Sequence, residues 1–102
     1  MSSTFDPLIH QAVRLRVMAT LCTLPPDDSI DFVYLKKLLH LTDGNLGSHL
    51  EKLEQAGYLQ VQRLHAGRNA KSLLQATTSG RAAYENHRRA LLDILESEGD
   101  SE

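Results

Sequence analysis

A chain of 102 residues is long enough for one domain with a single modest core, and its 41% hydrophobic and 24% charged residues are ordinary for a globular protein. It contains neither an apolar run of roughly 20 residues that could span a bilayer nor the segments of an export signal, and its lone Cys22 excludes an internal disulfide. We therefore expect a cytoplasmic protein without a membrane anchor, in which Cys22 is a small buried apolar residue rather than a redox switch.

The net charge of −2 argues against DNA as a partner until the distribution of the charges is considered. The last ten residues hold five acidic residues and no basic one, whereas residues 52–81 hold five basic residues and one acidic residue. This basic segment is compatible with a nucleic-acid partner. From charge alone, a solvated surface explains it at least as well.

The first expected element is a helix that begins at Asp6-Pro7, because Asp is a preferred N-cap and Pro fits the first helical position. The segment LIHQAVRLRVMATLC that follows carries two apolar stripes, at residues 8, 12, 15, 19 and 22 and at residues 9, 13, 17 and 21. A helix that is apolar around most of its circumference is buried on more than one side. In so small a chain, the second side predicts a partner subunit.

Two closely spaced helices come next. Residues 29–31 predict a very short strand, with Asp31 capping a helix over residues 32–40. After the tight turn at residues 40–42, we expect Thr42 to cap a helix over about residues 43–56. Gly57 stands where a helix end favours a left-handed residue. The two helices predict a helix–turn–helix.

After Gly57 the periodicity changes to the alternation of a strand. Residues 58–62 and 72–76 predict a β-hairpin with a basic turn between them. The run Thr77-Thr78-Ser79 offers caps for a last helix to about Glu96, and we expect residues 97–102 to form an acidic disordered tail. The order of elements predicts a mainly α fold with a small β-hairpin, of the α+β class, in one domain over residues 1–96.

The segments LTDGNLGSHLEKLEQAGYL and VQRLHAGRNAKSLLQATTSGR resemble the small winged helix–turn–helix transcriptional regulators of the MarR/ArsR-like group. In that family a leucine-rich recognition helix ends in an L-x-x-L-x-x-x-G-Y/L pattern, a wing with a Gly-Arg tip follows, and T-x-x-G-R opens the last helix. The resemblance covers about residues 8–95. It implies a sequence-specific regulator with the helix over residues 43–56 in the major groove of double-stranded DNA and the wing over residues 58–76 at the adjacent minor groove or backbone.

Two glycines lie in the front half of the expected recognition helix, although each costs a helix interior roughly 1 kcal/mol relative to alanine. With three leucines turned inward, the opposite face has a small, polar front that could approach DNA closely. The predicted DNA-binding residues are Thr42, Gly44, Asn45, Gly47, Ser48 and Lys52, to which the resemblance adds Arg68 and Lys71 in the wing. The alternatives are that the glycines relieve crowding against the preceding helix and that the wing tip is a solvated turn.

Two residues depart from the family pattern. His40 stands in the turn where glycine is frequent, although histidine tolerates a positive φ better than most residues. Glu51 places an acid on the expected DNA-facing surface, where it would repel phosphate or accept a hydrogen bond from a cytosine amino group.

We further expect a homodimer built by the first and last helices, because a two-fold dimer places two recognition helices on successive major grooves. The predicted interface residues are Leu8, Ala12, Leu15, Ala83, Leu91, Ile94 and Leu95. The alternative is a monomer whose last helix closes its own core.

Other functions receive less support from the sequence. The five scattered histidines and the lone cysteine predict no metal site and no cofactor, and no nucleophile motif or phosphate loop indicates an enzyme. A small-molecule effector could bind between helices or at a subunit interface. The main alternative function is a winged-helix module that binds another protein and never touches DNA.

Overall fold

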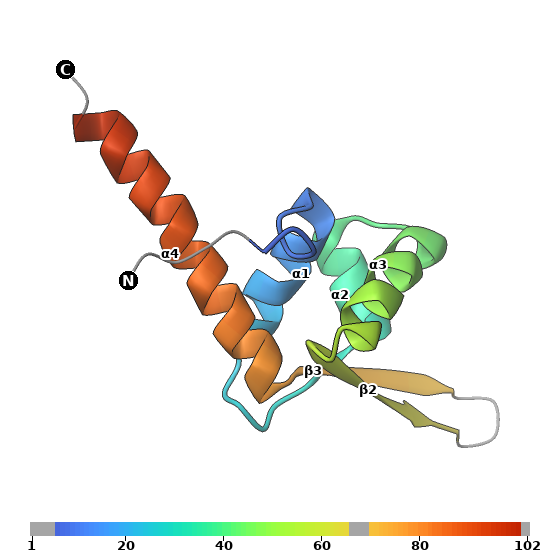
Figure 1. Ribbon diagram of the computed structural model, residues 1–102. Helices are drawn as coiled ribbons and strands as arrows, with labels where there is room; N and C mark the ends of the chain where they lie inside the picture. Colours follow the sequence, from blue (N-terminus) through green and yellow to red (C-terminus); the bar gives the residue numbers. More distant parts are fainter. Residues whose placement is uncertain (1–5, 66–69, 101–102) are drawn as a thin grey trace.

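The computed structural model describes residues 6–65 and 70–100, with side chains up to residue 97. Helix α1 spans Ala12–Cys22, strand β1 Ile30–Asp31, helix α2 Phe32–Leu39, helix α3 Asp43–Gln55, strand β2 Leu59–Leu64, strand β3 Lys71–Ala76 and helix α4 Thr78–Asp100. The β2–β3 hairpin and the far end of α4 project from opposite sides of the helical core (Figure 1). This is the predicted α+β winged helix–turn–helix.

Helix α1 lies at the centre of the core, where it contacts α3, β3 and α4. The largest fully buried apolar side chains are Ile9, Val17, Met18, Leu21, Leu35, Leu46, Leu53 and Leu74. The apolar circumference of α1 is therefore covered largely within the chain, with α3 on one side and β3 and α4 on another. Sequence reasoning correctly predicted burial on two sides, but the chain's own last helix supplies much of the second cover.

The three strands form one antiparallel sheet in the order β1-β3-β2. The hairpin is in register from the pair Leu59–Ala76 at its base to the pair Leu64–Lys71 towards its tip. Strand β1 pairs Ile30 with Leu74, so the short segment before α2 anchors the hairpin to the helix–turn–helix.

The predicted start of the first helix at Asp6-Pro7 is wrong. The Asp6 carboxylate accepts hydrogen bonds from the backbone N–H groups of Leu8 and Ile9, but the turn that it caps ends at once. Gln11 then adopts an extended backbone (φ −64°, ψ 133°), and its side chain accepts from the first N–H groups of α1. Because an extended residue cannot continue a helix, α1 begins at Ala12, and Leu8 lies outside it.

The predicted starts of α2 and α3, and the turns that follow them, agree with the structure. The Asp31 and Thr42 side chains accept backbone hydrogen bonds at the starts of α2 and α3 (3.2 and 3.1 Å). His40 adopts the left-handed conformation (φ 57°) that glycine supplies in related turns, and Gly57 follows α3 at φ 79°. Histidine therefore occupies the left-handed position of the turn between α2 and α3.

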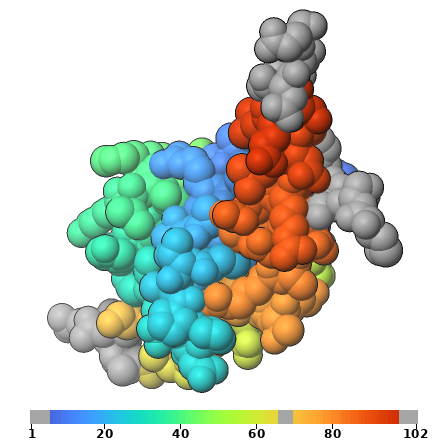
Figure 2. All heavy atoms as spheres, turned by 90° about the vertical axis from the view of Figure 1, so that its left-hand side faces the viewer, coloured from blue at the N-terminus to red at the C-terminus, as the bar shows by residue number. Residues whose placement is uncertain are grey.

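Helix α4 runs along α1 with its first half and extends beyond the core with its second half (Figure 2). It continues to Asp100, past the predicted end at Glu96, so residues 97–100 are helical rather than part of a disordered tail. No proline interrupts this segment, and the preceding turns already nucleate the helix. No helix in the described part of the chain is both long and apolar enough to cross a bilayer.

The T-x-x-G-R segment at the start of α4 has a packing role. The Thr77 hydroxyl accepts from the Gly80 N–H (2.9 Å) and donates to the Gly57 carbonyl (2.6 Å). A Cβ atom on Gly80 would lie 1.9 Å from the backbone oxygen of Tyr58, so only glycine allows this approach. The Arg81 guanidinium donates to four backbone carbonyls around the end of α1, those of Leu21, Cys22, Leu24 and Pro25.

Candidate nucleic-acid interface

The outer face of α3 presents the residues that the sequence predicted. Three leucines of α3, Leu46, Leu50 and Leu53, are buried. The predicted DNA-binding residues of this element are all exposed except the half-buried Gly47: Thr42, Gly44, Asn45, Gly47, Ser48 and Lys52. The structure therefore gathers these six residues on or beside one small, polar surface. Their contact with DNA stays a prediction.

The two glycines of α3 are not required by the packing of the chain. A Cβ atom added to Gly44 or Gly47 would meet no atom within 4 Å, and neither glycine has a positive φ. The interpretation that they relieve crowding against α2 is therefore wrong. Alanine would fit both positions and favour the helix, so the fold gains nothing from glycine there.

The negative charge of Asp43, at the start of α3, is paired with a lysine of the neighbouring helix α2. The Asp43 carboxylate forms an ion pair with Lys36 of α2 at 2.7 Å. Because Lys36 balances the charge of Asp43, the helix N-terminus carries no uncompensated negative charge that would repel phosphate. The N–H groups there favour such an anion.

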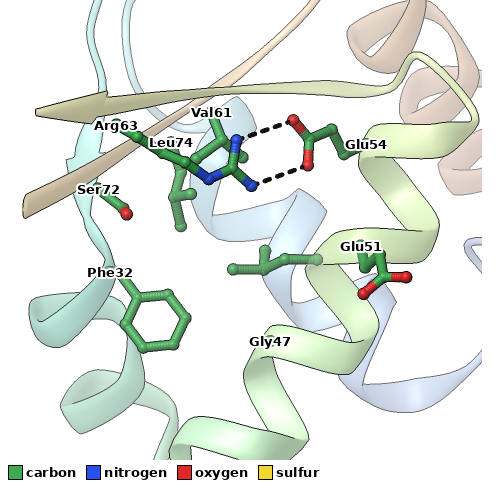
Figure 3. Close-up of a pocket in the computed structure, with 9 residues that line it drawn as sticks. Phe32, Gly47, Glu51, Glu54, Val61, Arg63, Ser72 and Leu74 are labelled. Carbon is green, nitrogen blue, oxygen red and sulfur yellow. Dashed lines mark hydrogen bonds and ion pairs between the residues drawn. The ribbon is translucent and has the colours of Figure 1, made fainter.

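A cleft of about 170 Å³ separates α3 from the wing (Figure 3). Its apolar walls come from four elements and include Phe32 of α2, Leu50 of α3, Val61 of β2 and Leu74 of β3. Gly47 lies at its α3 side, so this glycine faces the space between the recognition helix and the wing.

Two of the five basic residues in the segment over residues 52–81 are already engaged by partners within the chain. Arg81 is engaged with the carbonyls at the end of α1, and Arg63 forms an ion pair with Glu54 at 3.3 Å. Lys52 on α3 and Lys71 at the start of β3 are exposed. The predicted contact Arg68 lies outside the described residues.

A polar junction on α4 joins parts of the chain that are distant in sequence. His87 is fully buried, and its Nδ1 accepts a hydrogen bond from the backbone N–H of Asp6 (3.0 Å). Its proton therefore sits on Nε2, which lies 3.3 Å from Nδ1 of His10. Burial lowers the pKa of His87, and His10 lowers it further, while Asp6 acts in the opposite direction.

Asp6 also accepts a hydrogen bond from the hydroxyl of Tyr58, at the base of the wing. This bond, together with burial, raises the pKa of Tyr58 to about 12. A second histidine contact joins Arg14 of α1 to His49 of α3 (3.1 Å), and burial followed by the charges of Arg14 and Lys52 lowers the pKa of His49. Sequence reasoning missed these contacts because their partners are 35 to 81 residues apart.

The histidine junction does not offer a metal site. Because the hydrogen bond from Asp6 leaves the proton of His87 on Nε2, that nitrogen has no lone pair for an ion. Among the residues that the structure describes, no group of three or more His, Cys, Asp or Glu side chains could hold a metal.

The predicted dimer residues divide into two groups. Leu8, Leu15 and Ala83 are half-buried against the chain's own core. Beyond them, Ile94 and Leu95 are 43% and 65% exposed on the projecting half of α4, Leu91 is half-buried there, and Ala12 is exposed at the start of α1. Leu92, which the prediction omitted, is 40% exposed.

Comparison with known proteins agrees with this architecture. A family model described as a winged helix DNA-binding domain matches residues 13–95. The chain is 33% identical over 87 residues to the uncharacterized protein MJ0432 of Methanocaldococcus jannaschii, covering 85% of this chain and 91% of that protein.

Two solved structures are similar. One is a transcriptional regulator homologue from Pyrococcus horikoshii OT3 (TM-score 0.79, 27% identity, 88% of this chain and 86% of the other). The other is NadR in complex with 4-hydroxyphenylacetate, which shares the fold (TM-score 0.62, 22% identity, 89% of this chain and 64% of NadR). The chain belongs to the winged helix DNA-binding domain family and is a DNA-binding regulator.

Proposed function

We propose that this protein is a sequence-specific transcriptional regulator that inserts α3 into the major groove of double-stranded DNA. The observation that carries the proposal is the pair Gly44 and Gly47, which disfavour the helix and which the packing of the chain does not require. Such a cost is understandable if a partner must approach the backbone of α3 closely.

The dimensions of helix and groove explain why glycine would matter. An α-helix with its side chains is about 10–12 Å wide, and the major groove of B-DNA is about 12 Å wide. A helix that lacks side chains on its leading face can therefore sit deeper in the groove. Asn45 and Ser48, which are exposed beside the glycines, would then reach base edges, and Thr42 lies at the start of the same helix.

The wing would contact the adjacent minor groove or backbone. Lys71 is exposed at the start of β3, and Lys52 is exposed on α3. Both are suited to phosphate, which positions a protein on DNA without reading its sequence. We include Arg68 in the same role on the basis of the family pattern.

We further propose that the regulator is a homodimer formed through the projecting half of α4. Its apolar side chains Leu92, Ile94 and Leu95 remain 40%, 43% and 65% exposed among the residues that the structure describes. Each such side chain contributes about 1.5–3 kcal/mol when fully buried, before the entropy of association is subtracted. A two-fold dimer would place two α3 helices about 34 Å apart on one face of the duplex.

NadR binds a small aromatic acid in its solved complex. We infer that this fold is compatible with a small-molecule effector, which in the present chain would bind between helices or at the subunit interface.

The glycines provide a direct test. We expect Gly44→Ala and Gly47→Ala each to raise the free energy of unfolding by roughly 0.5–1 kcal/mol, because alanine favours the helix. We expect the same variants to weaken binding to a duplex selected from a random library by about 1–3 kcal/mol, the cost of one poorly fitting contact. Urea denaturation and fluorescence anisotropy measure the two effects.

The matched control is Asn86→Ala, at an exposed position on α4. It should stabilise its helix and leave DNA binding unchanged. Glycine variants that bind as tightly as the wild type would overturn the interpretation that DNA approaches the backbone of α3 at these glycines. A wild-type protein that binds no duplex even at low salt would favour the alternative, a module that binds another protein.

A further inference from the structure

An ion pair spans the cleft between the recognition helix and the wing. Two guanidinium nitrogens of Arg63, on β2, donate to the two carboxylate oxygens of Glu54, on α3, at 3.3 and 3.4 Å (Figure 3). The side chains are 58% and 34% exposed. A cation of the wing is thus neutralised by an acid of the recognition helix.

The pair lies where DNA backbone would pass if the proposed docking is correct. With α3 in the major groove and the wing at the adjacent minor groove, the sugar-phosphate strand between the two grooves must cross the space between helix and wing. Arg63 and Glu54 stand at that space, above the apolar wall formed by Leu50, Val61 and Leu74. One of these side chains attracts phosphate and the other repels it.

The pair is weak enough to exchange partners. Ion pairs with this degree of exposure contribute little to stability, because water screens the attraction. A guanidinium can form two parallel hydrogen bonds with a phosphate, as it does with a carboxylate. A phosphate that enters the cleft can therefore take Arg63 from Glu54.

We propose that Glu54 holds Arg63 away from DNA until a duplex is fully seated, and that Glu54 is thereby a specificity-determining residue. This inference rests on the proposed function. A loosely bound duplex meets a neutral pair and gains no attraction from Arg63. A well-fitting duplex brings phosphate into the cleft and acquires one further contact.

A competing role for the pair would be to fix the wing relative to α3. The two roles predict opposite signs. If Glu54 withholds Arg63, Glu54→Gln strengthens DNA binding, because Arg63 becomes available to every duplex. If the pair is a strut, the same substitution loosens the wing and weakens binding.

The experiment compares the wild type, Glu54→Gln, Arg63→Ala and the double variant on a selected duplex and on an unrelated one. We expect Glu54→Gln to bind both duplexes about two- to fivefold more tightly, with the larger gain on the unrelated duplex. Its salt dependence should steepen by up to about one unit, as for one additional phosphate contact. In the Arg63→Ala background, the gain from Glu54→Gln should fall sharply.

Glu51 supplies the matched control, since it lies on the same helix, lines the same cleft and accepts a hydrogen bond from Gln55 (3.3 Å). The effect of Glu51→Gln should be the same with and without Arg63. Weaker binding by Glu54→Gln, or a gain that persists in full without Arg63, would overturn the inference while leaving the proposed function intact. Absence of DNA binding by the wild type and all variants would overturn both.

Discussion

The first turns of α3 and α4 each contain a glycine, Gly44 and Gly80, and the surroundings of the two glycines differ. At Gly80 an added Cβ would lie 1.9 Å from the backbone oxygen of Tyr58, whereas at Gly44 it would meet nothing within 4 Å. The packing of the chain therefore explains Gly80 and does not explain Gly44. The comparison separates residues that the fold requires from residues whose explanation lies in a partner.

Helix α4 shows the same division along its length. His87 and Ala90 are buried against the chain's own core, whereas Ile94 and Leu95, one to two turns further on, are exposed. The first half of α4 closes the domain, as the monomeric alternative predicted. The second half lacks such a role within the chain, which is why we assign it to a second copy.

The largest expected effect is that of Gly80→Ala. The new methyl group would collide with backbone rather than with a flexible side chain, so α4 must move away from the base of the wing. We expect the free energy of unfolding to fall by about 3 kcal/mol or more, the upper range for overpacking. Urea denaturation measures it beside Gly44→Ala, which should be more stable than the wild type. Equal free energies of unfolding for the two variants would contradict the distinction between Gly80 and Gly44.

The next largest effect is expected in the outer half of α4. Ile94→Glu together with Leu95→Glu should convert a dimer into monomers of 11.4 kDa without loss of helicity, because both side chains are exposed and lie outside the buried core of the domain. Tight binding to a two-fold operator should be lost with the dimer. Light scattering and circular dichroism provide the measurements, and a wild-type protein that is already monomeric at micromolar concentration would contradict the proposal.

The division also explains what sequence reasoning could reach. Caps such as Asp31 and Thr42 depend on hydrogen bonds to residues three positions further on, so the local pattern predicts them. The sequence marks His40 only as a departure from the family pattern that tolerates a positive φ, and the structure gives it one. The start of α1 was missed because both Asp6 and Gln11 can cap, and only the extended backbone of Gln11 decides between them.

The candidate site was predictable to the same extent. Periodicity alone turns the leucines of α3 inward and so exposes Gly44 and Asn45. That Arg63 is paired with Glu54 and that Arg81 is bound to the end of α1 could not be read from charge counts, because both depend on contacts made only after the chain folds. The same holds for the part-buried contact between His10 and His87, which are 77 residues apart.

A smaller effect should distinguish base reading from phosphate contact among the proposed DNA-binding residues. Asn45→Ala is expected to lose about 1–3 kcal/mol of binding free energy only at particular base pairs. Lys71→Ala should weaken binding to all duplexes alike and flatten the salt slope by about one unit. Affinities across a set of operator variants at several salt concentrations distinguish the two patterns. Uniform losses for both substitutions would show that Asn45 does not read bases.

The smallest expected effect is the pH dependence of the free energy of unfolding. It tests the first half of α4, where His87 is buried within the chain. Burial, aided by His10, lowers the pKa of His87 in the folded protein below its ordinary value of 6.5. A lowered pKa means that the unfolded chain binds the proton first. The stabilisation is therefore complete above about pH 6.5 and is lost as the pH falls towards the folded pKa.

His49 has a lowered pKa as well, so the wild-type profile contains contributions of the same sign from two sites. Comparing the pH dependence of His87→Gln and His49→Gln with that of the wild type separates them. Because His87 is fully buried and accepts from the backbone of Asp6, whereas His49 is only half-buried, we expect His87→Gln to remove the larger share of the decline between pH 7 and pH 5. If His87→Gln retains the full decline in the free energy of unfolding, the Asp6–His87–His10 junction does not couple protonation to folding.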